Sequence, residues 1–395
     1  MLRPKLMRIM VAVITVMVAG LVAVSIASAA DKPPLKIGIL VPYSKVFAVL
    51  GESITYGAEL FFDQVGWQAG GRKIELIKED TEANPATGLR KARKLVDQDK
   101  VDATLGVVST AVLYAIRDYM HDAKSILMVA TAGGVDLSRS KRSPYIFRAA
   151  YSNWQLNYPM GKWYAENVGK KVFLLGSDYA AGREHLDSFK ESFLKAGGEI
   201  LGEALPPLGN NDFGPYLSKI TEAKAPGVFC FFAGSDAVRF VKQFVEYGLK
   251  GKVVLAGAGF MLEEDVLPAQ GEAALGGISS LNYAYTLDNP ENKAFKEAYI
   301  AKFKQEPNLY SVYGYDSARA LVEAINKING KTEDKEQFIK ALEGVKFASP
   351  RGPFSFDPVS HHVINNVYVR KVEQVEGKLH NVVIHNFGPI VDRSE

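Results

Sequence analysis

The sequence is poor in cysteine and carries almost no excess charge. Each shortage excludes certain structural features or binding partners. Cys230 is the one cysteine among 395 residues, so an internal disulfide is excluded. The formal net charge is +3, and three of the basic residues lie within the first eight positions. The remainder is close to neutral and gives no electrostatic reason to expect nucleic acid or an anionic membrane surface as a partner.

Residues 1–30 have the pattern of a cleaved signal peptide. Basic residues precede an apolar run over 9–26, and small residues close the segment at 27–30. We expect cleavage just before Ala30 or Asp31; an uncut anchor is the alternative, because the apolar run is nearly long enough to span a bilayer. No cysteine stands at the end of the segment to carry a lipid. The expected mature protein is therefore a free exported one, periplasmic in a cell with two membranes.

Beyond the leader the chain is longer than a single core supports, so two domains are expected. Strand and helix patterns alternate from Leu35 onward at the interval of βα units, and a second series with the same rhythm begins near residue 154. The sequence therefore predicts an α/β fold of two doubly wound lobes, joined by several chain crossings that let a cleft close over a ligand. The expected first lobe comprises 31–149 and 282–353, and the second comprises 150–281 and 354–395.

The stretch 101–134 organises the predicted site. It holds an apolar strand, a helical run that opens at Ser109-Thr110, and a second apolar strand that ends in Thr131-Ala132-Gly133-Gly134. In a parallel sheet, ligands sit outside the carboxyl ends of adjacent strands, where helix N-termini point free N–H groups at them. The two turns are therefore expected to share one crevice that favours a carboxylate. The alternative is that Ser109 only caps its helix and the glycines only turn the chain.

Short motifs in a particular order give the chain a family resemblance. They are KIGILVPYS at 36–44, ED followed by NPATG at 79–88, GVVSTAV at 106–112, LMVATAGG at 127–134, YIFRAAYSNWQ at 145–155, LLGSDYAAG at 174–182, YGYDSARAL at 313–321 and SPRGPFSFDP at 349–358. Together they resemble the periplasmic solute-binding proteins of branched-chain amino acid (Leu/Ile/Val-binding) ABC transporters, over nearly the whole sequence after the leader. The resemblance implies the type I periplasmic-binding fold. It also implies a non-catalytic, monomeric uptake receptor that delivers its solute to membrane permease subunits.

The resemblance further implies which residues hold the solute. In that family the ligand carboxylate is held by the loop matched here by Ser109-Thr110 and by the loop matched by Ala132, Gly133 and Gly134. The amino-acid binders hold the ammonium with a threonine and an acidic residue, and those two places match Gly134 and Ala258. A buried ammonium without acceptors loses solvation worth several kcal/mol. A carboxylate without an α-amine therefore becomes a candidate solute.

Aromatic residues near the expected mouth of the site favour an aromatic acid. These residues are Tyr43, Phe47, Tyr151, Trp154, Tyr179 and Phe260. The alternatives are that the rings belong to the core and that the solute is an aliphatic amino acid, with another acidic residue holding its ammonium. The acidic candidates are Asp178, Asp236, Glu263 and Asp265. The interpretation is a small carboxylate, either an aromatic acid or an amino acid.

The remaining motifs add one candidate ligand-binding residue, Arg148, and otherwise predict no further chemistry. Arg148 and Arg183 lie where a carboxylate could be clamped, although a surface ion pair is the commoner role for Arg183. His361-His362 would point to opposite faces of a strand, and no cysteine or carboxylate completes a metal-ligand set, so neither metal nor cofactor is expected. Asp236, in Gly234-Ser235-Asp236, has no evident histidine base, and no G-x-S-x-G elbow occurs. We expect no enzyme; a hydrolytic enzyme and a ligand sensor for a signalling partner stay as alternatives.

Overall fold

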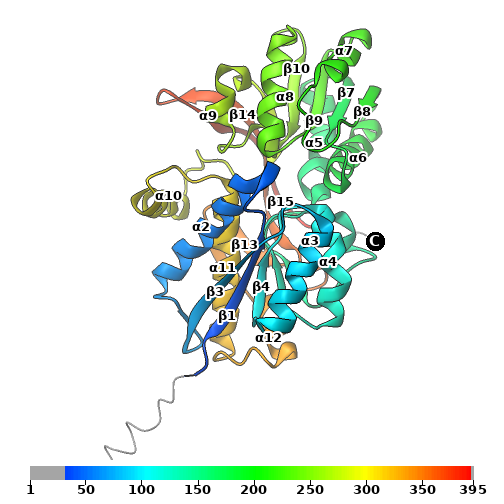
Figure 1. Cartoon of the computed structure of the whole chain (residues 1–395). Coiled ribbons are helices and arrows are strands. Elements are labelled where there is room, and N and C mark those ends of the chain that lie inside the picture. The colour runs from blue at the N-terminus through cyan, green and yellow to red at the C-terminus, as the bar shows by residue number, and fades with distance from the viewer. Residues whose placement is uncertain (1–31, 393–395) are drawn as a thin grey trace, which may run out of the picture.

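The protein has two lobes that lie end to end, each built on its own β-sheet (Figure 1). This computed structural model describes residues 32–392, so the expected leader at 1–30 lies outside the described part. Helices cover both faces of the first sheet and flank the second. The predicted α/β class with two doubly wound lobes is confirmed.

The first lobe contains a six-stranded sheet in the order β2-β3-β1-β4-β5-β6. All neighbouring strands in it are parallel except β2, which pairs antiparallel to β3. The strands are β1 (Leu35–Val41), β2 (Gln68–Ala69), β3 (Arg72–Asp80), β4 (Ala103–Gly106), β5 (Leu127–Val129) and β6 (Ile146–Arg148). The helices are η1 (Lys45–Phe47), α2 (Ala48–Gln64), α3 (Pro85–Arg93), η2 (Lys94–Gln98), α4 (Thr110–Asp122), η3 (Val135–Ser138), α10 (Pro290–Phe303), α11 (Leu309–Lys327) and α12 (Lys335–Glu343).

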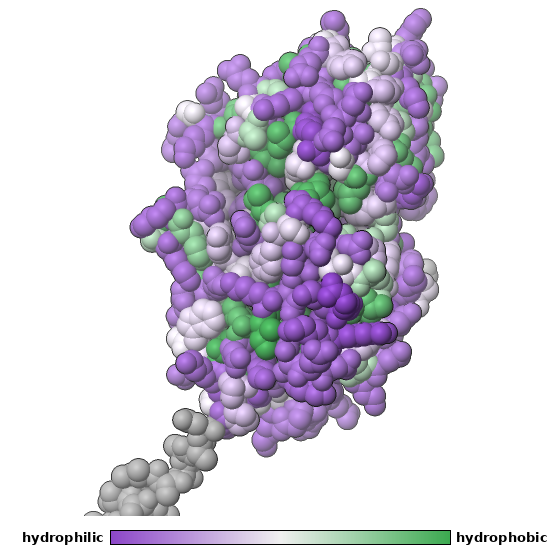
Figure 2. Space-filling model, in the orientation of Figure 1, coloured by the Kyte–Doolittle hydropathy of each residue, from purple (hydrophilic) through white to green (hydrophobic). Residues whose placement is uncertain are grey.

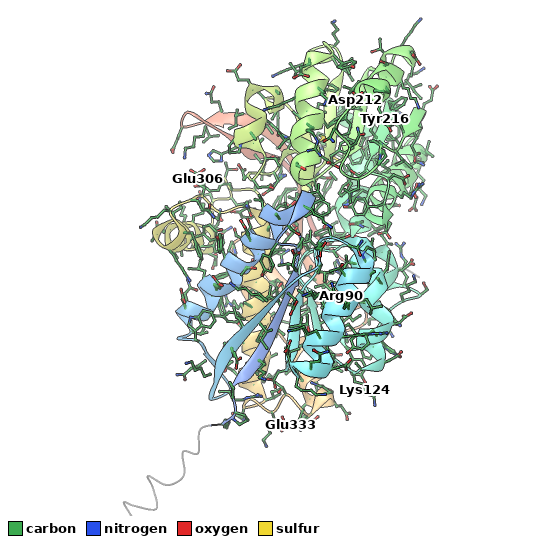
Figure 3. The ribbon with its side chains drawn as sticks, in the orientation of Figure 1. Arg90, Lys124, Asp212, Tyr216, Glu306 and Glu333 are labelled. Carbon is green, nitrogen blue, oxygen red and sulfur yellow. The ribbon has the colours of Figure 1, made fainter. Side chains whose placement is uncertain are left out.

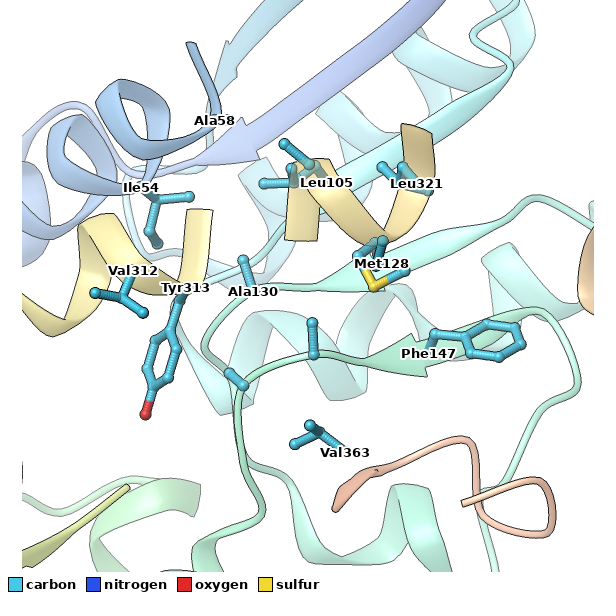
Figure 4. Close-up of a cluster of buried hydrophobic side chains, with 14 of the residues drawn as sticks. Ile54, Ala58, Leu105, Met128, Ala130, Phe147, Val312, Tyr313, Leu321 and Val363 are labelled. Carbon is cyan, nitrogen blue, oxygen red and sulfur yellow. The ribbon is translucent and has the colours of Figure 1, made fainter. Parts of the chain in front are cut away.

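Successive side chains of these strands point alternately to the two faces of the sheet, and apolar side chains cover both faces. On β5, Met128 packs in the cluster that holds Ile54 of α2 and Leu321 of α11 (Figure 4). Its neighbours Leu127 and Val129 pack in a second cluster, with α3 and α4. Successive side chains of a strand point to opposite faces, so a strand covered by helices on both sides must be apolar throughout. α11 packs against α2 on the first of these faces.

The larger sheet has the order β12-β13-β14-β11-β10-β9-β7-β8 with β15 paired to β14; β7 to β11 lie in the second lobe, whereas β12 and β13 pack in the core of the first. β7 to β11 are mutually parallel, and the long hairpin of β14 and β15 adds antiparallel strands beside β11. The strands are β7 (Lys171–Gly176), β8 (Glu199–Ala204), β9 (Gly227–Phe231), β10 (Val254–Ala258), β11 (Ile278–Leu281), β12 (Lys346–Ser349), β13 (Gly352–Phe356), β14 (Val363–Val375) and β15 (Lys378–Ile390). The helices are α5 (Asn153–Asn167), α6 (Ala180–Lys195), α7 (Gly214–Glu222), α8 (Gly234–Glu246), η4 (Gly259–Leu262), α9 (Leu267–Gln270) and η5 (Gly271–Ala274).

Most predicted elements are confirmed within a few residues, and the exceptions are short. The first apolar strand expected in 101–134 ends at Gly106, and η4 and α9 are two separate short elements between β10 and β11. The strands β2 and β12 were missed. Strands of two and four residues are too short to show a period in the sequence.

The chain crosses between the lobes after β6, after β11 and after β13, and polar side chains tie these crossings together. Asn282 donates a hydrogen bond to the carbonyl of Ala150 at 2.7 Å, and Arg351 donates to the same carbonyl at 2.8 Å. The predicted boundaries at 149/150, 281/282 and 353/354 stay a prediction. The ring of Phe356 in β13 packs against Phe147 of β6, with centroids 5.2 Å apart, which favours a last boundary beyond β13.

Charge covers the outer faces, whereas apolar side chains gather at the waist of the molecule. Figure 3 shows Arg90 and Lys124 on the first lobe and Asp212 on the second, all exposed. Figure 2 shows apolar side chains between the two lobes. Among the helices of residues 32–392, none combines the length and the apolarity that a bilayer crossing requires.

Candidate ligand-binding site

A small cavity lies between the two lobes. Its volume is about 20 Å³ in this closed arrangement. The lining residues are Phe47, Leu50, Val108, Thr110, Thr131, Tyr151, Tyr179, Ala181, Phe231, Ala233, Phe260 and Tyr310. They come from both lobes and from the first crossing, where Tyr151 lies, so a molecule in this space would touch both halves of the protein.

The polar end of the cavity is formed where β4 and β5 end. Thr110 is the first residue of α4 and Thr131 follows β5. Ser109 occupies the N-cap position of α4, but its side chain makes no capping bond, so the capping alternative is wrong. The hydroxyl oxygens of Ser109 and Thr131 are buried without a hydrogen-bond partner among residues 32–392. Since the first N–H groups of a helix have no partner inside it, hydroxyls and amides converge here on a place that suits a carboxylate.

The opposite wall consists of aromatic rings. Tyr151 and Phe260 lie 5.1 Å apart between ring centroids, and Phe260 lies 6.0 Å from Phe231. Behind them His185 stacks on Phe231 at 4.1 Å and meets Phe260 edge-on at 5.6 Å. Burial lowers the pKa of His185 well below its ordinary value, so the ring is neutral. An uncharged aromatic wall of this kind suits a flat apolar ring.

Five of the residues predicted from the sequence line this cavity. They are Phe47, Thr110, Tyr151, Tyr179 and Phe260. Sequence reasoning did not select Phe231 or Tyr310, because one sits in a wholly apolar strand and the other in a helix whose buried stripe looks like core. Thr131 was seen as the start of a turn, but the glycines after it were selected in its place.

The turn Ala132-Gly133-Gly134 is not among the residues that line the cavity, and its predicted contact with the ligand stays a prediction. A Cβ on Gly133 would lie 2.5 Å from the Tyr151 ring, and one on Gly134 would lie 2.9 Å from the Tyr114 ring. These glycines are therefore needed for close packing of neighbouring side chains. Thr131 is the residue of this turn that borders the cavity.

Arg148 is buried but is engaged elsewhere. Its Nη1 donates to the carbonyl of Gly134 at 2.6 Å, and its Nη2 lies 3.6 Å from a carboxylate oxygen of Asp392. Asp392 also accepts from the hydroxyl of Ser138 at 3.0 Å, which attaches the end of the described chain to the first lobe. The guanidinium is thus a structural link in this arrangement, and Arg148 does not border the cavity.

Three other predicted aromatic or acidic residues also lie outside the lining. The hydroxyl of Tyr43 lies 2.7 Å from the hydroxyl of Thr55. Trp154 stacks on Tyr158, with centroids 4.6 Å apart, in a groove on the outside of the second lobe. Asp236 accepts from the N–H of Gly209 at 2.8 Å and pairs with Arg239.

The acidic residues considered as ammonium partners do not face the cavity. None of the described residues that line it is acidic. Asp178 pairs with Arg183 at the surface, and Glu263 pairs with Arg370 at 2.8 Å. Asp265 has a buried carboxylate oxygen with no partner within residues 32–392, but it is outside the lining. The lining itself therefore supplies no counter-charge to an ammonium, although Asp265 acts electrostatically on the lining residue Tyr310.

The two adjacent histidines for which no metal site was expected are both buried. His361 stacks on Phe147 at 4.1 Å and lies 2.9 Å from Glu343, whereas His362 lies 3.0 Å from the amide oxygen of Gln155. In the part of the chain that the structure describes, no three His, Cys, Asp or Glu side chains converge as metal ligands.

The chain is similar over most of its length to known proteins. The family described as periplasmic binding protein matches residues 34–378. The Leu/Ile/Val-binding protein homolog 6 of Brucella melitensis is 32% identical over 367 residues, which cover 91% of this chain and 93% of that protein.

Solved structures of solute-binding proteins share the fold, which confirms the predicted type I arrangement. An ABC-transporter solute-binding protein of Rhodopseudomonas palustris BisB5, in complex with 3,4-dihydroxybenzoic acid, is 37% identical with a TM-score of 0.87, and the match covers 91% of this chain and 98% of that one. A second, from R. palustris in complex with benzoate, is 31% identical with a TM-score of 0.86 and coverage of 91% and 97%. This chain belongs to the periplasmic binding protein family, as a solute-binding protein of the ABC-transporter type.

Proposed function

We propose that this protein captures a small aromatic carboxylate between its lobes for an ABC uptake transporter. The observation that carries the proposal is the composition of the cavity. Thr110 and Thr131 stand at one end beside a helix N-terminus, aromatic rings form the wall, and no described lining residue is acidic. Hydroxyls and amides match a carboxylate, the rings match an aryl group, and the missing acid disfavours an α-amine.

Lobe closure is the mechanism that we infer for capture. Glu184 on α6 of the second lobe reaches the first lobe, where its carboxylate accepts from the Tyr114 hydroxyl at 2.5 Å and from the N–H of Val135 at 2.9 Å. Burial raises the pKa of Glu184, while these hydrogen bonds act against that rise. A ligand touching both lobes and this link both favour the closed form, which is then presented to permease subunits in the periplasm.

The expected affinity is micromolar. Two or three charge-assisted hydrogen bonds contribute roughly 1.5–3 kcal/mol each, and burial of one ring contributes a few kcal/mol. The cost of association offsets a large part of this gain. About −8 kcal/mol remains, which corresponds to a Kd of about 1 μM.

Some of the related proteins support an aromatic acid as the ligand, and others support a branched-chain amino acid. The R. palustris neighbours were solved with benzoate, 3,4-dihydroxybenzoic acid and p-hydroxybenzoic acid. The Brucella relative is named a Leu/Ile/Val-binding protein homolog. A branched-chain amino acid is thus the second candidate, and the unpartnered carboxylate oxygen of Asp265 within the described chain is the observation that favours it.

A ligand screen on the mature protein separates the two candidates. We expect benzoate and hydroxybenzoates to raise the melting temperature and to give a Kd by calorimetry, because ligands that bind the folded state stabilise it. Benzamide, which has the same ring without the negative charge, serves as the matched control and should give at most a small shift. Recovery of the solute unchanged distinguishes a receptor from an enzyme. Stronger stabilisation by leucine than by every aromatic acid would overturn the proposal.

A further inference from the structure

Tyr310 is the lining residue whose polar group the proposed capture of a carboxylate leaves unused. It lies in the first turn of α11, is 1% exposed, and its ring centroid is 6.3 Å from that of Phe260. Its hydroxyl is buried and has no hydrogen-bond partner among the described residues. Burial raises the pKa of Tyr310 well above its ordinary value, so the hydroxyl keeps its proton and can donate.

Other buried tyrosines nearby are satisfied by the protein itself. The hydroxyl of Tyr313, one helical turn along α11, donates to the side chain of Asn282 at 2.5 Å. The hydroxyl of Tyr283 donates to Asn292 at 3.0 Å. Buried polar groups in folded proteins are nearly always paired, so an exception needs an explanation. Tyr310 differs from these two residues in that it borders the cavity.

We propose that Tyr310 recognises a hydroxyl group on the ring of the solute, so that the preferred ligands are hydroxybenzoate-type acids and not unsubstituted benzoate. This inference rests on the proposed function, which places the carboxylate at Thr110 and Thr131. Tyr310 belongs to the same lobe as these threonines, and Phe260 of the second lobe packs against it. A ring hydroxyl supplies the partner that the Tyr310 hydroxyl lacks in the protein.

The physical basis is the cost of leaving a buried hydroxyl unpaired. A site built to bond a substrate hydroxyl discriminates against the analogue that lacks it, since its own polar group then stays buried without a partner. Benzoate would fill the aromatic wall equally well but would leave Tyr310 in that condition. The preference for the hydroxylated acid therefore depends on the Tyr310 hydroxyl, and removal of that hydroxyl should remove the preference.

Calorimetry with benzoate, 3-hydroxybenzoate and 4-hydroxybenzoate tests the inference on three proteins. In the unaltered protein, the better hydroxybenzoate is expected to bind at least fivefold more tightly than benzoate. In Tyr310→Phe that ratio should fall below two, because the hydroxybenzoate loses its partner and benzoate gains affinity. Tyr299→Phe is the matched control: its buried hydroxyl lies 3.5 Å from Gln305, outside the cavity, and the ratio should be retained.

Each possible result decides the matter. The role of Tyr310 is overturned if Tyr310→Phe leaves the affinity ratio of hydroxybenzoate to benzoate unchanged. It is also overturned if the native protein prefers benzoate. The proposed function stands in both cases. Failure of all three acids to bind overturns both. Leucine binding that Tyr310→Phe abolishes assigns Tyr310 to an amino-acid site and overturns the inference. The melting temperature of ligand-free Tyr310→Phe, expected to equal or exceed that of the native protein, shows that the variant is folded.

Discussion

Replacing Thr110 and Thr131 by valine tests the polar end of the cavity most directly. Valine keeps the shape of threonine and removes only the hydroxyl. Thr131 is buried with an oxygen that has no partner within residues 32–392, so its replacement removes no hydrogen bond of the described protein. The change should therefore leave the empty protein at least as stable and should act on solute capture alone.

The size of the effect follows from the type of bond lost. A hydrogen bond to a charged group contributes roughly 1.5–3 kcal/mol, and about 1.4 kcal/mol corresponds to a tenfold change in Kd. Each single variant is thus expected to bind an aromatic acid about tenfold more weakly, or worse. The two hydroxyls would hold one carboxylate, so their effects are coupled and need not multiply, and the double variant should lose at least about the tenfold of a single variant.

Calorimetric titration of the double variant with benzoate and hydroxybenzoates measures this loss. Thr104→Val provides the control, because Thr104 also carries a buried hydroxyl without a partner in the described chain but does not line the cavity. The control should bind within twofold of the native protein. If the double variant also binds within threefold, the carboxylate does not sit at the ends of β4 and β5, and the reasoning fails.

Three further changes probe the lobe contact, a helix start and a buried histidine. Glu184→Ala removes a carboxylate that accepts a hydrogen bond across the lobes, so solute affinity measured by calorimetry should fall about tenfold. Glu191→Ala, which changes an exposed acid of the same helix, is the control and should show no loss. Asn84→Ala deletes the side chain that accepts from the Thr87 N–H at 3.0 Å, and urea unfolding should show a loss of about 1 kcal/mol with unchanged solute affinity. Burial holds the pKa of His362 well below 6.5, so its stabilising contribution is complete above pH 6.5 and is lost as pH falls, by up to about 1.4 kcal/mol per pH unit. Unfolding at pH 7.5 and pH 5 should show a smaller difference for His362→Gln, and an equal difference would exclude this histidine as the cause.

The fold could be predicted from the sequence because its main signal is local. The apolar runs of β1 and β5 and the helical spacing of residues such as Ile54 and Ala58 each mark an element without knowledge of the rest. The start of α3 is local too: Asn84 precedes Pro85, and its side chain accepts a capping bond from the N–H of Thr87. Such features depend on neighbours a few residues away, and sequence patterns report these neighbours well.

The cavity could be predicted only in part because it is assembled from distant segments. Thr110 follows a strand end and was predicted from that position. Phe231 and Tyr310 lie far along the chain in elements that look uniformly apolar, and nothing local distinguishes a ring that borders a cavity from one in the core. The packing around the glycines after Thr131 could not be predicted for the same reason, since the rings that lie against them, Tyr114 and Tyr151, approach from other segments.

The solute class therefore depends on a few side chains at the waist and not on the scaffold. Relatives of this chain at 31–37% identity include a protein named for branched-chain amino acids and proteins solved with benzoate-type acids. In this chain the proposed carboxylate end, a helix N-terminus with hydroxyls, would suit either kind of ligand. The distinction lies in whether an acid borders the cavity, because an ammonium needs a counter-charge and a bare ring is disfavoured beside one. Here β10 ends at Ala258, which is buried and uncharged, and Glu263 beyond it is already paired with Arg370. Glu263 is thus engaged, and Asp265, with a carboxylate oxygen unpartnered within residues 32–392, is the residue by which the amino-acid candidate would have to hold its ammonium.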